Sequence, residues 1–193
     1  MTRILLIDGH PDPAPRRLCH ALADAYLEGA RAAGHTVTRI DLAGLDVPLL
    51  RSQEAFTGGA VPPELTGAAE ALCAAEHVVV VFPLWLGTMP ALLKAFFEQV
   101  MRPGVAFEYQ ANGLPKTLLK GRSARVVVTM GMPALVYRWW FRAHGVANLR
   151  RNILGFVGIG PVRETLLGGA ETAETATRER WLVRLRALGA AAR

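Results

Sequence analysis

The sequence lacks long apolar runs. Its strongest runs, such as VVVVF at 78–82, span four or five residues, whereas a helix needs about 20 apolar residues to cross a bilayer. Residues 3–8 have the pattern of a buried strand, not of a charged segment followed by the apolar core of a signal peptide. We therefore expect no stable membrane insertion and a cytoplasmic protein.

Cysteine is also scarce. The two cysteines, Cys19 and Cys73, fall in separate predicted helices and have no metal-ligand spacing, so we expect neither a structural disulfide nor a metal site. Cys19 falls in the first turns of its helix, where the helix dipole could lower the pKa of the thiol. Ordinary packing is the favoured interpretation of this residue.

Lysine occurs only at positions 94, 116 and 120, so arginine supplies most of the positive charge behind the net charge of +6. No basic run is long enough to act as a nucleic-acid arm, and no binding motif accompanies the arginines. We expect no nucleic-acid partner, and attraction to anionic small molecules fits this charge better. With 193 residues, 51% hydrophobic and 20% charged, the chain is expected to form a single domain over 1–193.

Apolar runs alternate with helical patterns along the chain. Strands are predicted at 3–8, 36–42, 77–82, 125–130 and 162–168. Helices are predicted at 16–33, 64–76, 91–102, 134–144, 148–157 and 171–188, with loop at 44–63 and an irregular excursion through residue 122. This alternation is typical of an α/β protein with a parallel sheet covered on both faces. We predict a flavodoxin-like three-layer sandwich with a five-stranded parallel sheet of order 2-1-3-4-5, whose ligands lie at the carboxyl ends of strands 1, 3 and 4.

The loop after the first strand, DGHPDPAPRRLCHA, has neither the GxGxxG nor the GxxxxGK[ST] pattern, which disfavours a dinucleotide Rossmann site and a P-loop. The helix is expected to begin at Pro15 or Arg16, where its free amides and dipole favour an anion. His10, Arg16 and Arg17 can add donors suited to a phosphate. The alternative is a solvated turn whose arginines face water.

The loop after the third strand, PLWLGTMP at 83–90, places an aromatic residue next to a buried strand. Pro83 ends sheet pairing, and Gly87 allows the backbone to approach a ligand closely. Amides between Leu84 and Gly87 could then face the edge of a planar ring, with Trp85 offering an aromatic face. Alternatively, Trp85 caps the core. Together with the first loop, this loop favours a flavin.

The loop after the fourth strand spans 129–145, and its Thr129 and Gly131 continue the same rim. Tyr137 and His144 are seven residues apart and could both reach a pocket above a bound ring. A structural role for each is the alternative. The aromatic run WWF that lies between them is predicted to be core or subunit contact.

The chain resembles the flavodoxin-fold NAD(P)H:quinone oxidoreductase family, which includes drug-activity modulators and potassium-efflux ancillary proteins. The resemblance rests on HPDP at 10–13, GHTVTRIDL at 34–42, FPLWLGTMPALLK at 82–94, RPGVAFEY at 102–109, the loop at 129–145 and NILGFVGIGPVRET at 152–165. The block FPLW…MPA.LK is the more specific of these motifs.

The resemblance implies a flavin site built from three loops. The implied cofactor-binding residues are His10, Arg16, Arg17, Leu18, Pro83, Leu84, Trp85, Leu86, Gly87, Thr129, Met130, Gly131 and Met132. Tyr137 and His144 match the family's pocket pair and would be the catalytic residues that assist charge and proton balance. The chain departs from the family at Pro15 and Arg17, where Ser and Asn are frequent, and at TMGMP, where many members have a Thr and Gly cluster.

The implied function is reduction of quinones or related electrophilic aromatics by NAD(P)H through a flavin, in a ping-pong cycle. FMN is the expected cofactor, with FAD as the alternative, and a homodimer with the flavin near its interface is implied. Two other functions remain open. One is a flavoprotein regulatory subunit that docks peripherally on a potassium-efflux antiporter. The other is a flavodoxin-like electron carrier, which the basic pI of about 10.0 disfavours because such a carrier is expected to have an acidic docking face.

Overall fold

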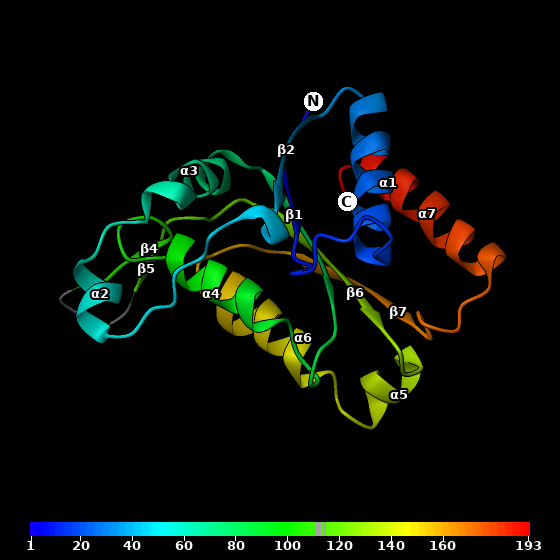
Figure 1. The fold of residues 1–193 in the computed structure, drawn as a ribbon. Helices are drawn as coiled ribbons and strands as arrows, with labels where there is room; N and C mark the ends of the chain where they lie inside the picture. Colours follow the sequence, from blue (N-terminus) through cyan, green and yellow to red (C-terminus); the bar gives the residue numbers. More distant parts are fainter. Residues whose placement is uncertain (111–112, 114) are drawn as a thin grey trace.

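A five-stranded parallel sheet forms the centre of the protein in this computed structural model, which describes residues 1–110, 113 and 115–193 (Figure 1). The strands are β1 (Arg3–Asp8), β2 (Thr36–Asp41), β3 (His77–Pro83), β6 (Ser123–Met130) and β7 (Val162–Gly168). Their order is β2-β1-β3-β6-β7, and every neighbouring pair is parallel. The predicted fold, order and five strand positions are therefore confirmed.

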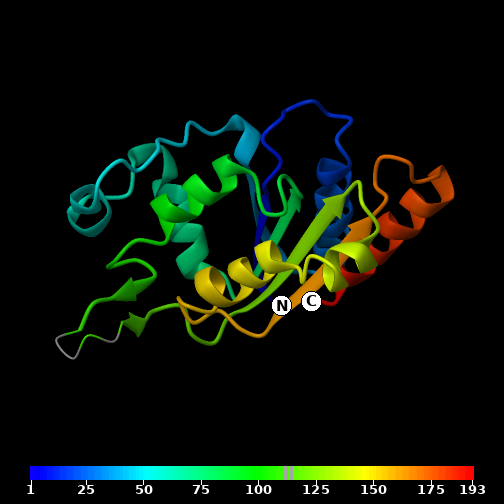
Figure 2. The same cartoon turned by 90° about the horizontal axis from the view of Figure 1, so that it is seen from below.

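Helices cover both faces of the sheet, which gives three layers (Figures 1 and 2). The helices are α1 (Leu18–Ala32), α2 (Gln53–Gly58), α3 (Thr66–Ala74), α4 (Ala91–Val100), α5 (Ala134–Trp139), α6 (His144–Asn148) and α7 (Thr175–Ala190). Short 3-10 turns lie at Leu42–Gly44 and Pro63–Leu65, a π-helical turn at Leu149–Leu154, and a small antiparallel pair is formed by β4 (Phe107–Glu108) and β5 (Lys116–Thr117). None of the helices within the described residues is long and apolar enough to cross a membrane.

The central strand β3 explains why a buried parallel strand has a continuous apolar sequence. Every residue from His77 to Pro83 is buried. Val78, Val80 and Phe82 belong to the core beneath α3 and α4. Val79 and Val81 belong to the core beneath α1 and α7. Because successive side chains point to opposite faces and both faces are covered, both sets must be apolar.

The helices α1 and α7 approach each other unusually closely, because glycine stands where they meet. A Cβ atom built on Gly29 of α1 would overlap the carbonyl oxygen of Arg186, and one built on Gly189 of α7 would overlap that of Tyr26. These are fixed backbone atoms, so a side chain at either position would push the helices apart. This contact holds α7 beside α1 on one face of the sheet.

Several predicted boundaries were wrong. The segment 44–63 is not all loop, because α2 forms there, with the Ser52 side chain capping the amide of Ala55. The helix predicted over 134–144 ends at Trp139, and the next begins at His144 instead of 148. Between them the chain breaks, since Arg142 and Ala143 have φ angles of 52° and 47°. Both values lie in the left-handed region that no α-helix includes.

Two more helices begin later than predicted. The backbone of Arg17 is extended, with φ −77° and ψ 133°, so α1 begins at Leu18 and not at 16. The C-terminal helix was predicted from 171 and begins at Thr175. Positions 111, 112 and 114 of the predicted irregular excursion lie outside the described residues.

We predict that Gly29→Ala lowers the free energy of unfolding by about 1–3 kcal/mol, the usual cost of overpacking. The added methyl group meets the backbone of Arg186, and this cost exceeds the gain of up to about 1 kcal/mol in helix propensity. Gly67→Ala in α3 is the matched control, because nothing lies within 4 Å of the new methyl group. Urea unfolding measures both, and equal stabilities of the two variants would contradict the close contact.

Candidate functional site

A cavity of about 310 Å³ opens at the carboxyl edge of the sheet. Its walls come from the segments that follow β1, β3, β6 and β7. The lining residues are His10, Arg16, Arg17, Leu18, Cys19, Pro83, Leu84, Trp85, Thr129, Met130, Gly131, Ala170, Glu171 and Arg178. The three predicted loops therefore meet in one cavity, as expected where the strand order reverses in a parallel sheet.

Three of the predicted cofactor-binding residues do not line this cavity. Leu86 is fully exposed and lines an adjacent cavity of about 490 Å³, which it shares with Trp85. Gly87 lies at the tip of the same turn, and Met132 is partly buried against the core. Conversely, Cys19, Ala170, Glu171 and Arg178 line the cavity without having been predicted to do so. Ala170 and Glu171 lie in the loop after β7, the neighbour of β6 in the sheet, so the predicted strand order could have indicated them, whereas Arg178 lies in α7.

One end of the cavity is positively charged. The helix α1 begins there, and Arg17 accepts hydrogen bonds through its carbonyl from the amides of His20 and Ala21. The amides of Leu18 and Cys19 precede these and donate to no other backbone group in the described part of the chain. Such amides, together with the helix dipole, favour an anion.

The arginines at this end are not equivalent. Arg17 is paired with Asp12, to which its Nε donates at 2.8 Å. Arg16 makes no ion pair with any described residue. Arg178 donates through Nη2 to the carbonyl oxygens of Ala170 and Glu171, at 3.2 and 3.4 Å. The guanidinium of Arg16 is therefore the one best able to bind an anionic ligand directly.

The turn after β3 forms the other end of the cavity. Trp85 and Thr88 exchange backbone hydrogen bonds of 2.9 and 3.0 Å, while Leu86 and Gly87 have φ angles of 47° and 80°. Two positive φ angles in succession define the tight hairpin turn of type I′. The amide of Leu84 donates to the carbonyl oxygen of Thr129 at 2.8 Å. Of the amides predicted to face a ring, those of Leu86 and Gly87 are therefore left without a backbone acceptor among the described residues.

Trp85 lies between the two cavities and does not cap the core. Trp85 is 48% exposed and lines both cavities, so its aromatic side chain is accessible to a planar ligand. Its ring stands edge-on to that of His10, with centroids 5.9 Å apart. His10 in turn accepts a hydrogen bond from the amide of Asp12 at Nδ1, at 3.1 Å, which leaves its Nε2 as the donor.

The structure buries Tyr137 of the predicted pair and leaves His144 exposed. The ring of Tyr137 is buried, and its hydroxyl donates to the carbonyl oxygen of Gly87 at 3.0 Å and accepts from the amide of Val146 at 3.3 Å. Tyr137 therefore ties the turn after β3 to α6. His144 is exposed at the first turn of α6. Neither side chain lines the 310 Å³ cavity, although Asn148, one turn after His144, lines the adjacent one.

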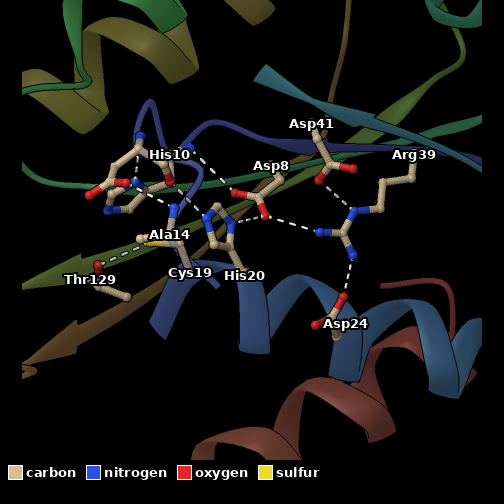
Figure 3. Close-up of polar contacts among 10 residues, drawn as sticks. Asp8, His10, Ala14, Cys19, His20, Asp24, Arg39, Asp41 and Thr129 are labelled. Carbon is tan, nitrogen blue, oxygen red and sulfur yellow. Dashed lines mark hydrogen bonds and ion pairs between the residues drawn. The ribbon is translucent and has the colours of Figure 1, made fainter. Parts of the chain in front are cut away.

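A buried carboxylate anchors the first loop (Figure 3). Asp8, 1% exposed at the end of β1, accepts from the amide of His10 at 3.3 Å, from Nη2 of Arg39 at 3.2 Å and from Nδ1 of His20 at 2.6 Å. Burial lowers the pKa of His10, and the charge of His20 lowers it further, against the effect of Asp8 and Asp12. The sequence offered no pattern that singled out Asp8 or His20.

Cys19 lines the cavity together with Thr129, and its Sγ lies 3.3 Å from the Thr129 Oγ1 (Figure 3). Burial raises the pKa of this thiol to about 12, against the lowering effect of the hydrogen bond to Thr129. The structure therefore supports ordinary packing for Cys19, because the thiol is buried and its pKa is raised.

The donors and surfaces of the cavity suit a phosphorylated planar aromatic molecule. Free amides and arginine lie at one end, and the exposed indole of Trp85 lies at the other. Gly131 has no side chain between them, and a Cβ atom there would come within 3.1 Å of Glu171. No group of three His, Cys, Asp or Glu side chains that could hold a metal ion occurs within 1–110, 113 and 115–193.

Comparison with known families agrees with this geometry. The profile described as flavodoxin-like fold matches residues 2–188 of the chain. The chain belongs to the flavodoxin-like fold family.

Two relatives of this flavodoxin-like chain carry the same description. It is 34% identical over 167 residues to the FMN-dependent NADH:quinone oxidoreductase of Shewanella amazonensis, with 79% of this chain and 83% of the relative covered. It is 30% identical over 174 residues to that of Bordetella avium, with 82% and 83% covered. The resemblance inferred from the sequence motifs is thereby confirmed.

Solved structures share the flavodoxin-like fold. Smu.1420 from Streptococcus mutans has a TM-score of 0.83 at 23% identity, covering 97% of this chain and 98% of its own. The NAD(P)H:quinone oxidoreductase from Methanothermobacter marburgensis has a TM-score of 0.75 at 24% identity, covering 98% and 96%. At these identities the likeness establishes the fold.

We predict that a maleimide reagent labels Cys73, and not Cys19, in the native state of this flavodoxin-like protein. Cys73 is exposed, whereas Cys19 is buried and its pKa is about 12, so Cys19 is not a thiolate at neutral pH. Mass spectrometry of the labelled peptides distinguishes the two sites. Both thiols should react after unfolding in guanidinium, and rapid native labelling of Cys19 would contradict the assignment.

Proposed function

We propose that the protein is an FMN-dependent NADH:quinone oxidoreductase. The observation that carries this proposal is the cavity at the carboxyl edge, which is lined both by the start of α1 with its free amides and by an exposed tryptophan on a tight turn. The relatives from Shewanella amazonensis and Bordetella avium, both named for this activity, support it. Their names also favour FMN over FAD and NADH over NADPH.

The residues of the cavity fit FMN in two parts. Arg16 and the amides of Leu18 and Cys19 would hold the phosphate, because a guanidinium and free helix amides are its preferred donors. Trp85 and the backbone around Gly131 would bind the ring system. The remaining predicted cofactor residues that line the cavity, His10, Arg17, Leu84, Pro83, Thr129 and Met130, would complete its walls.

The protein would orient the reactants and exclude water, whereas bound FMN would supply the transfer of two electrons from NADH to a quinone. The adjacent 490 Å³ cavity shares Trp85 and is lined largely by apolar residues, among them Leu86, Met89 and Pro90. An apolar quinone would fit there, beside the site assigned to the ring. Ping-pong order follows if NADH and the quinone use this space in turn.

A homodimer in the cytoplasm is part of the proposal. Trp139, Trp140 and Phe141 are 77%, 82% and 49% exposed, which rules out the core as their environment and leaves subunit contact as the proposed role. A regulatory role on a potassium-efflux antiporter has no separate observation in its favour. The electron-carrier alternative is disfavoured by the basic pI of about 10.0 and by the enzyme names of the relatives.

The binding of FMN is the first test of this proposal. We expect the purified protein to bind FMN, with quenching of the flavin fluorescence, and to oxidise NADH in the presence of a benzoquinone. Trp85→Ala should raise the Kd for FMN about tenfold, or about 1.4 kcal/mol, as expected for loss of an aromatic contact. Trp85→Phe keeps an aromatic face and should retain most of the affinity. A protein that binds no FMN would refute the proposed function.

The catalytic roles of Tyr137 and His144 remain a prediction. We expect His144→Gln to lower kcat at saturating FMN about tenfold, a modest fraction of the 10²–10⁴-fold typical of general acid catalysis. Its unfolding free energy should change by less than about 0.5 kcal/mol, because the side chain is exposed. A wild-type kcat in this variant would exclude His144 from the reaction.

The variant Tyr137→Phe tests the other residue of the predicted catalytic pair. It removes the hydroxyl that bonds to Gly87 and Val146, so it should lower the unfolding free energy by about 1–3 kcal/mol. If Tyr137 also assists the reaction, kcat at saturating FMN falls as well. A stability loss with an unchanged kcat would restrict Tyr137 to holding the turn.

A further inference from the structure

His20 lies between two hydrogen-bond acceptors (Figure 3). Its Nδ1 is 2.6 Å from Oδ2 of Asp8, and its Nε2 is 2.9 Å from the carbonyl oxygen of Asp12. A neutral imidazole has one N–H donor and one lone pair, so it would point a lone pair at one of these oxygens. An imidazolium donates at both nitrogens. The geometry therefore selects the charged form of His20.

The surroundings of His20 favour the same form. Burial alone lowers the pKa of His20, but the hydrogen bonds to Asp8 and to the carbonyl of Asp12, with the negative charge of Asp8, outweigh burial and the charge of Arg39, so the pKa is raised. Arg39 also contacts Asp8, with its Nη2 3.2 Å from Oδ2, so the same carboxyl oxygen has both Arg39 and His20 as neighbours.

Asp12, whose carbonyl oxygen accepts from His20, also makes hydrogen bonds to other residues of the loop. Its amide donates to Nδ1 of His10 at 3.1 Å, and its Oδ1 accepts from the amide of Ala14 at 2.8 Å. Its Oδ2 pairs with Arg17, the residue that immediately precedes α1. Through Asp12, His20 therefore connects β1 to the loop 9–17 and to the start of α1, where the anion-binding amides lie.

We propose that His20, as an imidazolium that bridges Asp8 and Asp12, is a positioning residue that shapes the loop 9–17 to bind the FMN phosphate. Loss of its proton then weakens phosphate binding at alkaline pH. This inference rests on the proposed function, since it names how one part of the same site is held.

The sign of the pH dependence follows from the groups around His20. They are Asp8 of β1, the loop residues His10, Asp12 and Arg17, and Arg39 of β2, whose further partners are Asp24 and Asp41. Because the pKa of His20 is raised, the bridge is present below that pKa and is lost as the pH rises through it. The pKa of His10 is lowered from its ordinary value, so His10 is neutral above about pH 7. A flavin phosphate is a dianion above its second pKa of about 6. Neither group therefore changes its charge at alkaline pH.

The experiment compares the Kd values of FMN and riboflavin between about pH 7 and pH 9.5, the range above the ordinary histidine pKa. Riboflavin has the same ring system without the phosphate, so the ratio of the two Kd values reports the phosphate site alone. In the wild type we expect the preference for FMN to fall about tenfold over this range, the effect of one hydrogen bond to a charged group. The Kd of riboflavin should not follow the titration of His20.

His20→Gln should abolish this pH dependence. A glutamine has one amide NH₂ and one carbonyl oxygen, so it cannot donate from both ends of the bridge. Its preference for FMN at pH 7 should equal that of the wild type at alkaline pH. His35→Gln is the matched control, because His35 Nδ1 accepts from the amide of Thr2 and Nε2 faces the carbonyl of Ala190, both at 3.1 Å. A neutral imidazole satisfies that pair, so this variant should keep the wild-type profile.

Nitrogen-15 NMR of histidine-labelled wild-type protein gives a second readout that needs no variant to fold. Both ring nitrogens of His20 should be protonated at pH 7 and should titrate together with the preference for FMN. A neutral His20 at pH 7, or a preference for FMN that neither pH nor His20→Gln changes, would overturn the inference while leaving FMN binding intact. A wild-type protein that binds neither flavin would instead overturn the proposed function, and this inference with it.

Discussion

The site depends on two hydrogen bonds that join β3 and the residue after it to the chain segments on either side, one just after β1 and one in β6. The amide of Gly9 donates to the carbonyl oxygen of Val81 at 2.7 Å, and the amide of Leu84 donates to that of Thr129 at 2.8 Å. These two bonds fix where the chain leaves β1 and β3, so the loops after β1, β3 and β6 emerge in register. A Cβ atom on Gly9 would come within 3.1 Å of the Val81 carbonyl and 2.8 Å of a Leu93 methyl group, which shows how closely the backbone segments approach.

The strands were predictable because each one can be recognised from its own run of apolar residues. A strand buried on both faces needs apolar residues at successive positions, and the continuous burial of β3 reflects such a run. The helix boundaries depended on tertiary contacts. The helix α2 was predicted as loop from its glycines and prolines, yet the guanidinium of Arg102 donates to the carbonyl oxygens of Ala55 and Gly59 at its end. Arg102 lies more than 40 residues along the chain, so no short sequence pattern could reveal this contact.

The part of the candidate site that lies in loops at the carboxyl ends of adjacent strands was predictable. Trp85 and Gly131 lie on the cavity because the strand order brings their loops together. Arg178 reaches it from α7, which lies beside α1 through the close contact at Gly29 and Gly189. That contact depends on two glycines 160 positions apart, which in isolation are indistinguishable from glycines in ordinary turns. Side-chain orientation was beyond the sequence as well, since the Tyr137 hydroxyl turns inward to Gly87.

The acidic side chains of the first loop and of the end of β1 are paired with donors from the protein itself. The carboxylate of Asp8 has donors from His10, His20 and Arg39, and that of Asp12 takes the guanidinium of Arg17. An unpaired buried carboxylate would repel a phosphate and would destabilise the fold, so this internal pairing makes an anion site possible beside two acidic residues. The loop has Pro15 and Arg17 in place of hydroxyl and amide side chains, and Arg17 is paired with Asp12. The loop can still present an anion site, because the charge of Arg16 and the amides of α1 are left for a ligand.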